Sequence, residues 1–322
     1  MTRRAALLLL AGLALLVLLA IALLASARFS RHAPDVPRVV VGGGDAGGLP
    51  RAQPSDERID AAALERAVQD AAAGGLQALL VMRDGHVVFE HYGRGQSADT
   101  VIDSGPMAQV LVALAAGVAA KQGALSLATL RGFDANALRA ALEAGTQQRY
   151  ELYLSHAIWS RLNAAAAWIE LPASGAPTPA DCCFHARMLD WMRVASLLVD
   201  DGRFEGKQIV PPGWVARMAR PVSLDSVHGF GVEIPATARG AEAFAADGVF
   251  FLRGPGRCRL WLVPALRLAV LFAADAPKAS AALASASTWD ETRIPNLVIR
   301  AVSDRPMQRG DVTDLQRLVP GH

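Results

Sequence analysis

The most continuous apolar stretch of the chain lies at its N-terminus, where Ala5 to Ala25 carry no polar side chain and follow Arg3 and Arg4. In a helix that rises ~1.5 Å per residue, such a run spans roughly 30 Å, the thickness of a bilayer core. The arginines favour a cytoplasmic N-terminus. We therefore expect residues 1–27 to anchor the chain in the cytoplasmic membrane by a single pass, with the domain on the periplasmic or extracellular side. Ala25-Ser26-Ala27 also fits a signal-peptide cleavage site, and cleavage there would secrete the domain.

The pattern of apolar and polar residues changes after this apolar stretch. Residues 28–57 are rich in Gly, Pro and charge, which predicts a linker. The apolar residues from Ile59 to Ala73 recur at helical spacing. The stretch from Leu76 to Tyr92 holds two apolar runs on either side of Asp84-Gly85, a strong signal for a β-hairpin. Met107 to Lys121 has helical spacing and almost no charge, as expected for a buried central helix.

The rest of the chain contains helical segments first and strands later. We expect a short, mostly helical stretch over 128–148 and a helix from Tyr150 to Leu162 that buries Leu152, Ile158, Trp159 and Leu162. Further helices are predicted over 190–198, after Pro211 and over 297–302, and strands over 229–234, 248–253, 259–264 and 267–272. This segregation predicts an α+β fold, with an antiparallel sheet flanked by helices, over residues 58–304. Residues 305–322 are then a C-terminal tail.

The composition narrows the function classes. The 322 residues carry a formal net charge of +2, which gives no argument for nucleic acid as a partner. No metal site and no cofactor motif is evident. The three cysteines, Cys182, Cys183 and Cys258, make no disulfide framework. We expect Cys182 and Cys183 to act as buried small hydrophobes. A bridge from one of them to Cys258 is an alternative in an oxidising compartment.

Several segments resemble the serine hydrolases related to class C β-lactamases, penicillin-binding proteins and small esterases. The similarity runs from about Ile59 to Ser303, and its most specific segments are 81–93 (VMRDGHVVFEHYG), 181–218, 246–272 and 289–300. The resemblance implies a β-lactamase/transpeptidase-like fold. The segment between Leu127 and Tyr150 is shorter than in active relatives, which implies a reduced helical subdomain.

Active relatives carry Ser-x-x-Lys at the N-terminus of the central helix, where the amine takes the hydroxyl proton. In this sequence the matching residues are Pro106 and Gln109. Proline has no hydroxyl, and the neutral amide of Gln109 is no base near neutral pH. Proline fits the first turn of a helix, so the fold tolerates a change that removes the chemistry.

Two further motifs of the family are altered. The Tyr-x-Asn motif has no match, because neither Tyr150 nor Tyr153 is followed by x-Asn. The Lys/His-x-Gly triplet matches the stretch from Arg253 to Cys258, where Pro255 takes the His position and removes a backbone donor. The sequence therefore predicts no catalytic residue, and Pro106, Gln109 and Pro255 are degenerate positions.

Three functions remain open. The first is a membrane-anchored, catalytically inactive relative that binds a small molecule or peptide in a retained cleft and regulates cell-envelope processes. We expect that cleft to be lined by Ser104, Met107, Gln109, Arg253 and Arg257. The second is an active esterase or amidase with displaced residues. Ser104 is the candidate nucleophile there, although a helix N-cap accounts for it equally. The third is an envelope interaction module without a working pocket.

Overall fold

The computed structural model describes residues 36–72, 74–93, 95–126, 132–172, 178–223, 226–235, 242–274 and 291–306. The predicted anchor over 1–27 and residues 307–322 of the predicted tail lie outside these ranges. Within the described ranges, no helix is both long and apolar enough to cross a bilayer.

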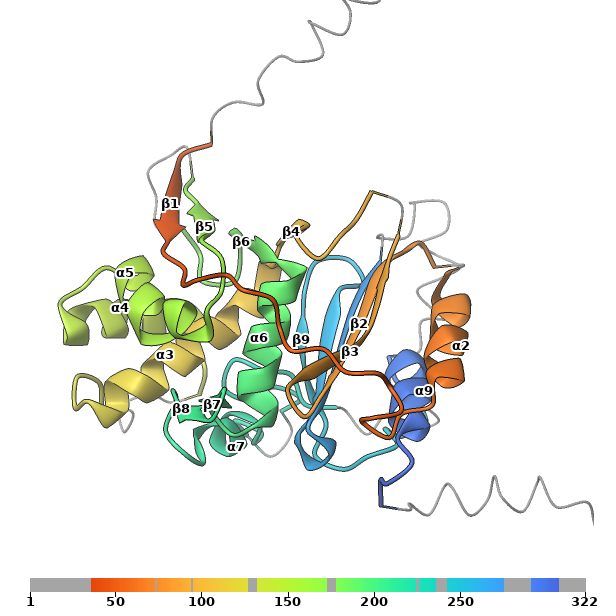
Figure 1. Ribbon diagram of the computed structural model, residues 1–322. Helices are drawn as coiled ribbons and strands as arrows, with labels where there is room; N and C mark the ends of the chain where they lie inside the picture. Colours follow the sequence, from red (N-terminus) through yellow and green to blue (C-terminus); the bar gives the residue numbers. More distant parts are fainter. Residues whose placement is uncertain are drawn as a thin grey trace, which may run out of the picture.

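A five-stranded antiparallel sheet forms the centre of the fold, in the order β3-β2-β11-β10-β9 (Figure 1). β2 (Leu76–Arg83) and β3 (His86–Tyr92) are the hairpin predicted from the sequence. Asp84 and Gly85 both have positive φ, 49° and 84°, as the tight turn of a two-residue hairpin requires. The later part of the chain supplies the other three strands: β9 (Phe250–Arg253), β10 (Arg259–Val263) and β11 (Leu268–Ala274).

Helices cover both faces of this sheet, so the predicted α+β layer arrangement is confirmed. One face packs against α2 (Ala61–Ala72) and α9 (Arg293–Ala301), and the other against α6 (Met188–Val199), with α3 (Gln109–Lys121) beyond it (Figure 1). Along β2, Leu79 faces the first layer and Leu80 the second, because side chains alternate across a strand. Burial on both faces explains why the strands are almost continuously apolar.

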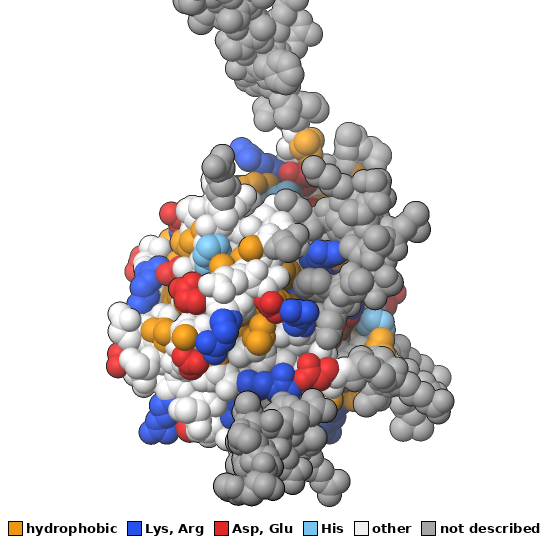
Figure 2. Space-filling model, turned by 90° about the vertical axis from the view of Figure 1, so that its right-hand side faces the viewer, with side chains coloured by type: hydrophobic (Ala, Val, Ile, Leu, Met, Phe, Trp, Pro, Cys, Tyr) orange, Lys and Arg blue, Asp and Glu red, His pale blue; other side chains and the backbone are white. Residues whose placement is uncertain are grey.

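The outer surface of α2 and α9 is polar. Arg293 bonds Asp70 at 2.7 Å and thereby links the two helices, and Arg66 bonds Asp60 at 3.2 Å. Figure 2 shows this side of the molecule, where acidic and basic side chains are interspersed. The described part of this face therefore presents no broad area of a single charge sign.

A second, four-stranded sheet lies beside the first and was not predicted from the sequence. Its order is β1-β5-β6-β4, with all neighbours antiparallel. The strands are β1 (Arg38–Val41), β4 (Val101–Asp103), β5 (Ala167–Glu170) and β6 (Phe184–Arg187). β1 lies in the range that the sequence assigns to a linker, and Arg51, in the same range, pairs with Val87 of β3.

The helical part next to α3 consists of α4 (Ala135–Thr146), α5 (Tyr150–Leu154) and two short turns that end at Leu162. The expected helix from Tyr150 to Leu162 is continuous along the backbone, but it changes from α to π geometry at Ser155 and to 3₁₀ geometry at Ser160. Leu152 is 56% exposed, so its expected inward position is wrong. Residues 229–234 contribute single bridges rather than the predicted strand. The remaining elements are β7 (Arg203–Phe204), β8 (Lys207–Gln208) and α7 (Trp214–Met218).

Candidate functional site

The start of α3 is the point at which the sequence predicts lost chemistry. A short 3₁₀ turn, η1 (Gly105–Ala108), leads into α3 and carries Pro106 in its first turn, and Gln109 is the first residue of α3. Gly105 has a φ of 48°, which suits glycine, and its N–H donates to Asp103 Oδ1 at 3.0 Å. Pro106 has no N–H, so this position offers neither a nucleophile nor a backbone donor.

Ser104, just before η1, is fully buried. Its hydroxyl oxygen accepts a hydrogen bond from Trp191 Nε1 at 3.0 Å, and its N–H donates to Phe184 O at 2.8 Å. Ser104 occupies the N-cap position of η1 as expected, but its side chain makes no cap hydrogen bond there. Met107 is also buried, with its sulfur 3.7 Å from Cys258 Sγ. The expectation that Ser104 and Met107 line the cleft is wrong, because both side chains belong to the core.

A pocket of about 350 Å³ opens beside Pro106 and Gln109, within the ~300–1,000 Å³ typical of ligand sites. Arg253 of β9 also lines it, together with Phe251 and Leu252 from the same strand. The other lining residues are Phe133, Val222, Ser226, His228, Gly229, Gly231, Val232 and Glu233.

Of those five residues, Gln109 and Arg253 line the pocket, whereas Ser104, Met107 and Arg257 do not. Arg257 sits in the turn between β9 and β10, and its guanidinium lies beside Gly74, at the end of α2. Pro255, in the same turn, packs its ring against Gly105, where an added Cβ would come within 2.8 Å of the Pro255 ring. The turn therefore closes over the backbone of η1, and Pro255 brings no N–H to that contact.

The pocket contains one ion pair. Arg253 donates from Nε to Glu233 Oε1 at 2.7 Å and from Nη2 to Glu233 Oε2 at 2.6 Å. Such two-bond pairs fix geometry as well as charge. Glu233 raises the pKa of Arg253 above its usual value. The backbone of Glu233 also pairs with Phe251, so the loop that carries the carboxylate is held on the edge strand β9.

Sequence reasoning missed the residues that the helical part and the 222–233 loop bring to the pocket. Phe133, just before α4, supplies an aromatic ring and packs edge-to-face on Phe230 at 4.8 Å. It has no hydroxyl to serve as the phenolic oxygen that the resemblance expects from the helical subdomain. Tyr150 and Tyr153 lie in α5 and do not line the pocket. Burial raises the pKa of both phenols.

Ser226 is the one hydroxyl among the residues that line this pocket. Its Oγ donates to His228 O at 3.0 Å and accepts from His228 N at the same distance, so it is bonded to backbone and not to a base. No lysine lines the pocket, and within the described ranges no three His, Cys, Asp or Glu side chains cluster as a metal site. This lining can hold a ligand by shape and hydrogen bonds, but it pairs no nucleophile with a base.

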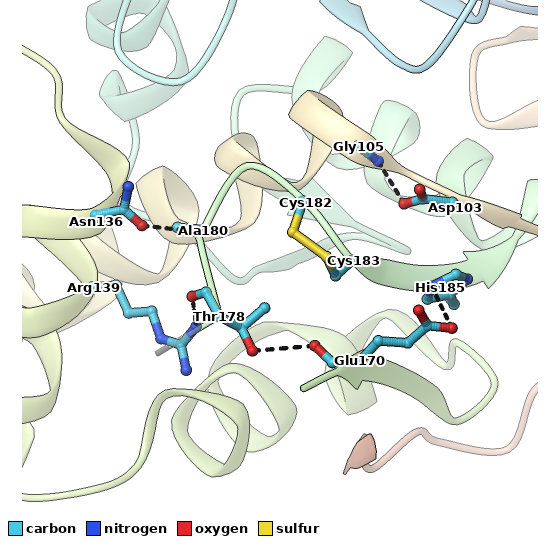
Figure 3. Close-up of a disulfide and its surroundings, with 10 residues drawn as sticks. All are labelled: Asp103, Gly105, Asn136, Arg139, Glu170, Thr178, Ala180, Cys182, Cys183 and His185. Carbon is cyan, nitrogen blue, oxygen red and sulfur yellow. Dashed lines mark hydrogen bonds and ion pairs between the residues drawn. A yellow bond between two sulfur atoms is a disulfide. The ribbon is translucent and has the colours of Figure 1, made fainter. Parts of the chain in front are cut away.

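The cysteines differ from both expectations. Cys182 and Cys183 form a disulfide with each other, and both are partly exposed (Figure 3). The expected role as buried small hydrophobes is wrong for this pair. Cys258 is free and buried, so the alternative bridge to Cys258 is wrong as well. Burial raises the pKa of the Cys258 thiol to about 12.

No protein-family model matches the sequence, and no curated protein matches it. Solved structures do match. A protein from Bacillus anthracis assigned as a 6-aminohexanoate-dimer hydrolase aligns with a TM-score of 0.61 and 13% identity, over 79% of this chain and 89% of that one. A β-lactamase from Mycobacterium bovis gives 0.56 and 15%, over 73% and 99%. A family VIII carboxylesterase gives 0.54 and 12%, over 79% and 99%.

The chain has the fold of the β-lactamase-like serine hydrolases. The resemblance inferred from the sequence is thereby confirmed at the level of fold. Identities of this size carry no activity from one chain to another, so the function of this β-lactamase-like chain has to be argued from its own pocket.

Proposed function

We propose that this β-lactamase-like chain is a catalytically inactive binder of a small ligand, which occupies the pocket beside Pro106. One observation carries the proposal. A pocket of about 350 Å³ persists at the start of α3, while Pro106 and Gln109 supply neither a nucleophile nor a base there. Removing one member of a cooperating catalytic group already costs most of the rate, and here the hydroxyl, the amine and the phenol are all missing.

The lining indicates the chemistry of the ligand. Phe133, Val232 and Phe251 give apolar walls, and Gln109 offers an amide that both donates and accepts hydrogen bonds. Arg253 and Glu233 neutralise each other, so the walls attract neither anions nor cations strongly. A small neutral acyl compound, such as an amide or an ester, fits this combination. The similar structures include an amide-dimer hydrolase and a carboxylesterase by name.

The proposed place of action is the outer side of the cytoplasmic membrane. The support comes from the apolar run from Ala5 to Ala25, which suits a single-pass anchor. The disulfide between Cys182 and Cys183 adds to it, because disulfides persist outside the reducing cytoplasm. Cleavage after Ala27 would instead release the same domain. Mass spectrometry of the N-terminal peptide from membranes of the producing cell distinguishes the two.

A labelled fluorophosphonate tests the inactive state, with an active carboxylesterase of the same fold treated in parallel. We expect covalent labelling of the esterase and none of this chain. Saturable labelling that Ser226→Ala or Ser104→Ala abolishes would contradict the proposal and support a displaced nucleophile instead.

Thermal unfolding with three neutral acyl compounds, ε-caprolactam, N-butylbutanamide and p-nitrophenyl butyrate, tests binding. A ligand at a hundred times its Kd stabilises the folded state by about 2.7 kcal/mol, so at least one of the three should raise the Tm. Arg253→Ala should reduce the ligand-induced rise in Tm, because it leaves the Glu233 carboxylate in the pocket wall without its ionic partner. Arg51→Ala, which breaks an Arg–Glu pair remote from the pocket, should leave it unchanged. No shift with any of the three would contradict the ligand class.

A further inference from the structure

The bond between Cys182 and Cys183 lies outside the pocket of the proposed function, because neither residue lines it. Both sulfurs belong to partly exposed residues at the start of β6, whereas Cys258 is 7% exposed. A thiol reagent therefore has access to the pair and not to the third cysteine. Reactivity toward external thiols requires such access.

The bond also fixes an uncommon backbone. Joining two adjacent residues through their side chains closes a small ring, and Cys183 within it has a φ of 67°. Residues other than glycine rarely adopt this left-handed conformation, and they keep it where their surroundings impose it. In the dithiol form the ring is open, and the extended conformation of the neighbouring strand becomes the favoured one for Cys183. The oxidised and reduced forms therefore prefer different backbones at this position.

This segment is joined on both sides to neighbouring elements. Cys183 O accepts from Glu170 N at 2.9 Å, and the N–H of Ala180 donates to Asn136 Oδ1 of α4 at 2.8 Å (Figure 3). Phe184 follows directly, and its carbonyl accepts the N–H of Ser104 at 2.8 Å. A change in the backbone at Cys183 therefore reaches Ser104 through one residue and one hydrogen bond.

Ser104 passes this change on to the pocket. It is two residues from Pro106, whose ring lines the pocket, and it is locked in the core through its bond to Trp191. The ring of Phe184 packs edge-to-face on two tryptophans. Its centroid lies 5.1 Å from that of Trp159 and 6.2 Å from that of Trp191. Phe184, the residue next to the disulfide, therefore makes some of the contacts that hold η1 in place.

We propose that Cys182–Cys183 is a reversible thiol–disulfide site whose redox state controls the order of η1 at the edge of the pocket. The reactant is a dithiol. One of its thiolates attacks a sulfur of the pair, which breaks the bond between Cys182 and Cys183 and forms a mixed disulfide. The second thiol of the reactant then displaces the protein sulfur. The reactant leaves as a disulfide, and Cys182 and Cys183 each gain one hydrogen, so two electrons and two protons enter the protein.

Alkylation under native conditions tests the site. The folded full-length protein is treated with iodoacetamide before and after dithiothreitol, and the modified peptides are mapped. We expect no label without reductant, labels on Cys182 and Cys183 after it, and Cys258 labelled only in urea. Labelling of either adjacent cysteine without reductant overturns the proposal. Resistance of the bond to dithiothreitol until urea unfolds the protein overturns it too.

Amide hydrogen exchange tests the coupling to η1. Reduction should speed exchange in the peptide that covers residues 104–109 by about fivefold or more, the lower end of typical couplings between sites. The variant Cys182→Ser/Cys183→Ser should exchange like the reduced protein and should not respond to dithiothreitol, which controls for other effects of the reductant. Should that variant fail to fold, the comparison of oxidised and reduced wild-type protein still decides. Equal exchange in the two wild-type forms refutes the coupling.

Discussion

Replacing Ser104 by alanine separates a structural hydroxyl from a catalytic one. The substitution removes the oxygen that accepts the Trp191 Nε1 hydrogen bond at 3.0 Å, and both residues are fully buried. No water can replace the lost acceptor, so the indole N–H stays without a partner. An unsatisfied buried donor costs about 1–3 kcal/mol. We therefore expect Ser104→Ala to lower the free energy of unfolding by about 1–3 kcal/mol and to leave any ester turnover unchanged.

Urea unfolding of the purified protein, followed by tryptophan fluorescence, measures this loss. Ser226→Ala is the matched control, because its partly exposed hydroxyl bonds only to the backbone of His228. That variant should change stability by no more than about 0.5 kcal/mol, as most surface substitutions do. Trp191→Phe removes the donor instead. The double variant Ser104→Ala/Trp191→Phe leaves no unpaired group, so it should lose about 1 kcal/mol less than the two single losses combined.

Two results would refute this reasoning. If Ser104→Ala is as stable as the wild type, or if the double variant is simply additive, the buried hydrogen bond does not contribute as described. If instead the variant keeps its stability but loses a measurable hydrolysis of p-nitrophenyl esters, Ser104 is a nucleophile and the inactive state proposed for this chain is wrong.

Three further outcomes follow from the same geometry. Pro106→Ser/Gln109→Lys should remain unlabelled by a fluorophosphonate, because the phenol and the backbone donor lost at Pro255 are still missing; labelling would contradict this. Arg253→Ala should destabilise the protein more than Arg51→Ala, since Glu233 loses both hydrogen bonds from Arg253 whereas Glu90 keeps the hydrogen bond from the Tyr92 hydroxyl at 2.7 Å; urea unfolding compares them. Burial raises the pKa of the Cys258 thiol from 9.0 to about 12. As the pH rises, the unfolded state loses this proton before the folded state does. The free energy of unfolding should therefore fall between about pH 9 and about pH 12, and it should fall less steeply in Cys258→Ala. Urea unfolding at a series of pH values measures both.

The sequence predicted those parts of the fold that depend on near neighbours. The hairpin of β2 and β3 was found with its bounds, because Asp84-Gly85 encodes the turn and both flanking strands are apolar. The β1-β5-β6-β4 sheet was missed because its strands have only three or four residues each, and β1 pairs with a partner more than a hundred positions away. Short strands give too few alternating positions for the pattern to emerge.

In the site, too, the sequence identified the residues marked by a local pattern and missed those that the fold brings in. Pro106 and Gln109 were found because a local spacing marks them, and the pocket lies beside both. Phe133 and Glu233 carry no such mark, since Phe133 reaches the pocket only when α4 packs against α3, and Glu233 only when it pairs with Phe251 of β9. The adjacency of Cys182 and Cys183 was visible, but no local sequence pattern indicated their bond or the positive φ of Cys183 that accompanies it.

Two of the three degenerate positions, Pro106 and Pro255, serve the fold, which is consistent with a pocket that persists without the catalytic residues of the family. Pro106 begins a helix where its missing N–H has no helical partner to lose. Pro255 packs on Gly105, and Phe133 packs on Phe230. Part of the pocket wall comes from β9 and the start of α3, which the core requires in any case. In the proposed function, binding and catalysis therefore rest on different residues, so the loss of the catalytic residues leaves the structural basis of binding in place.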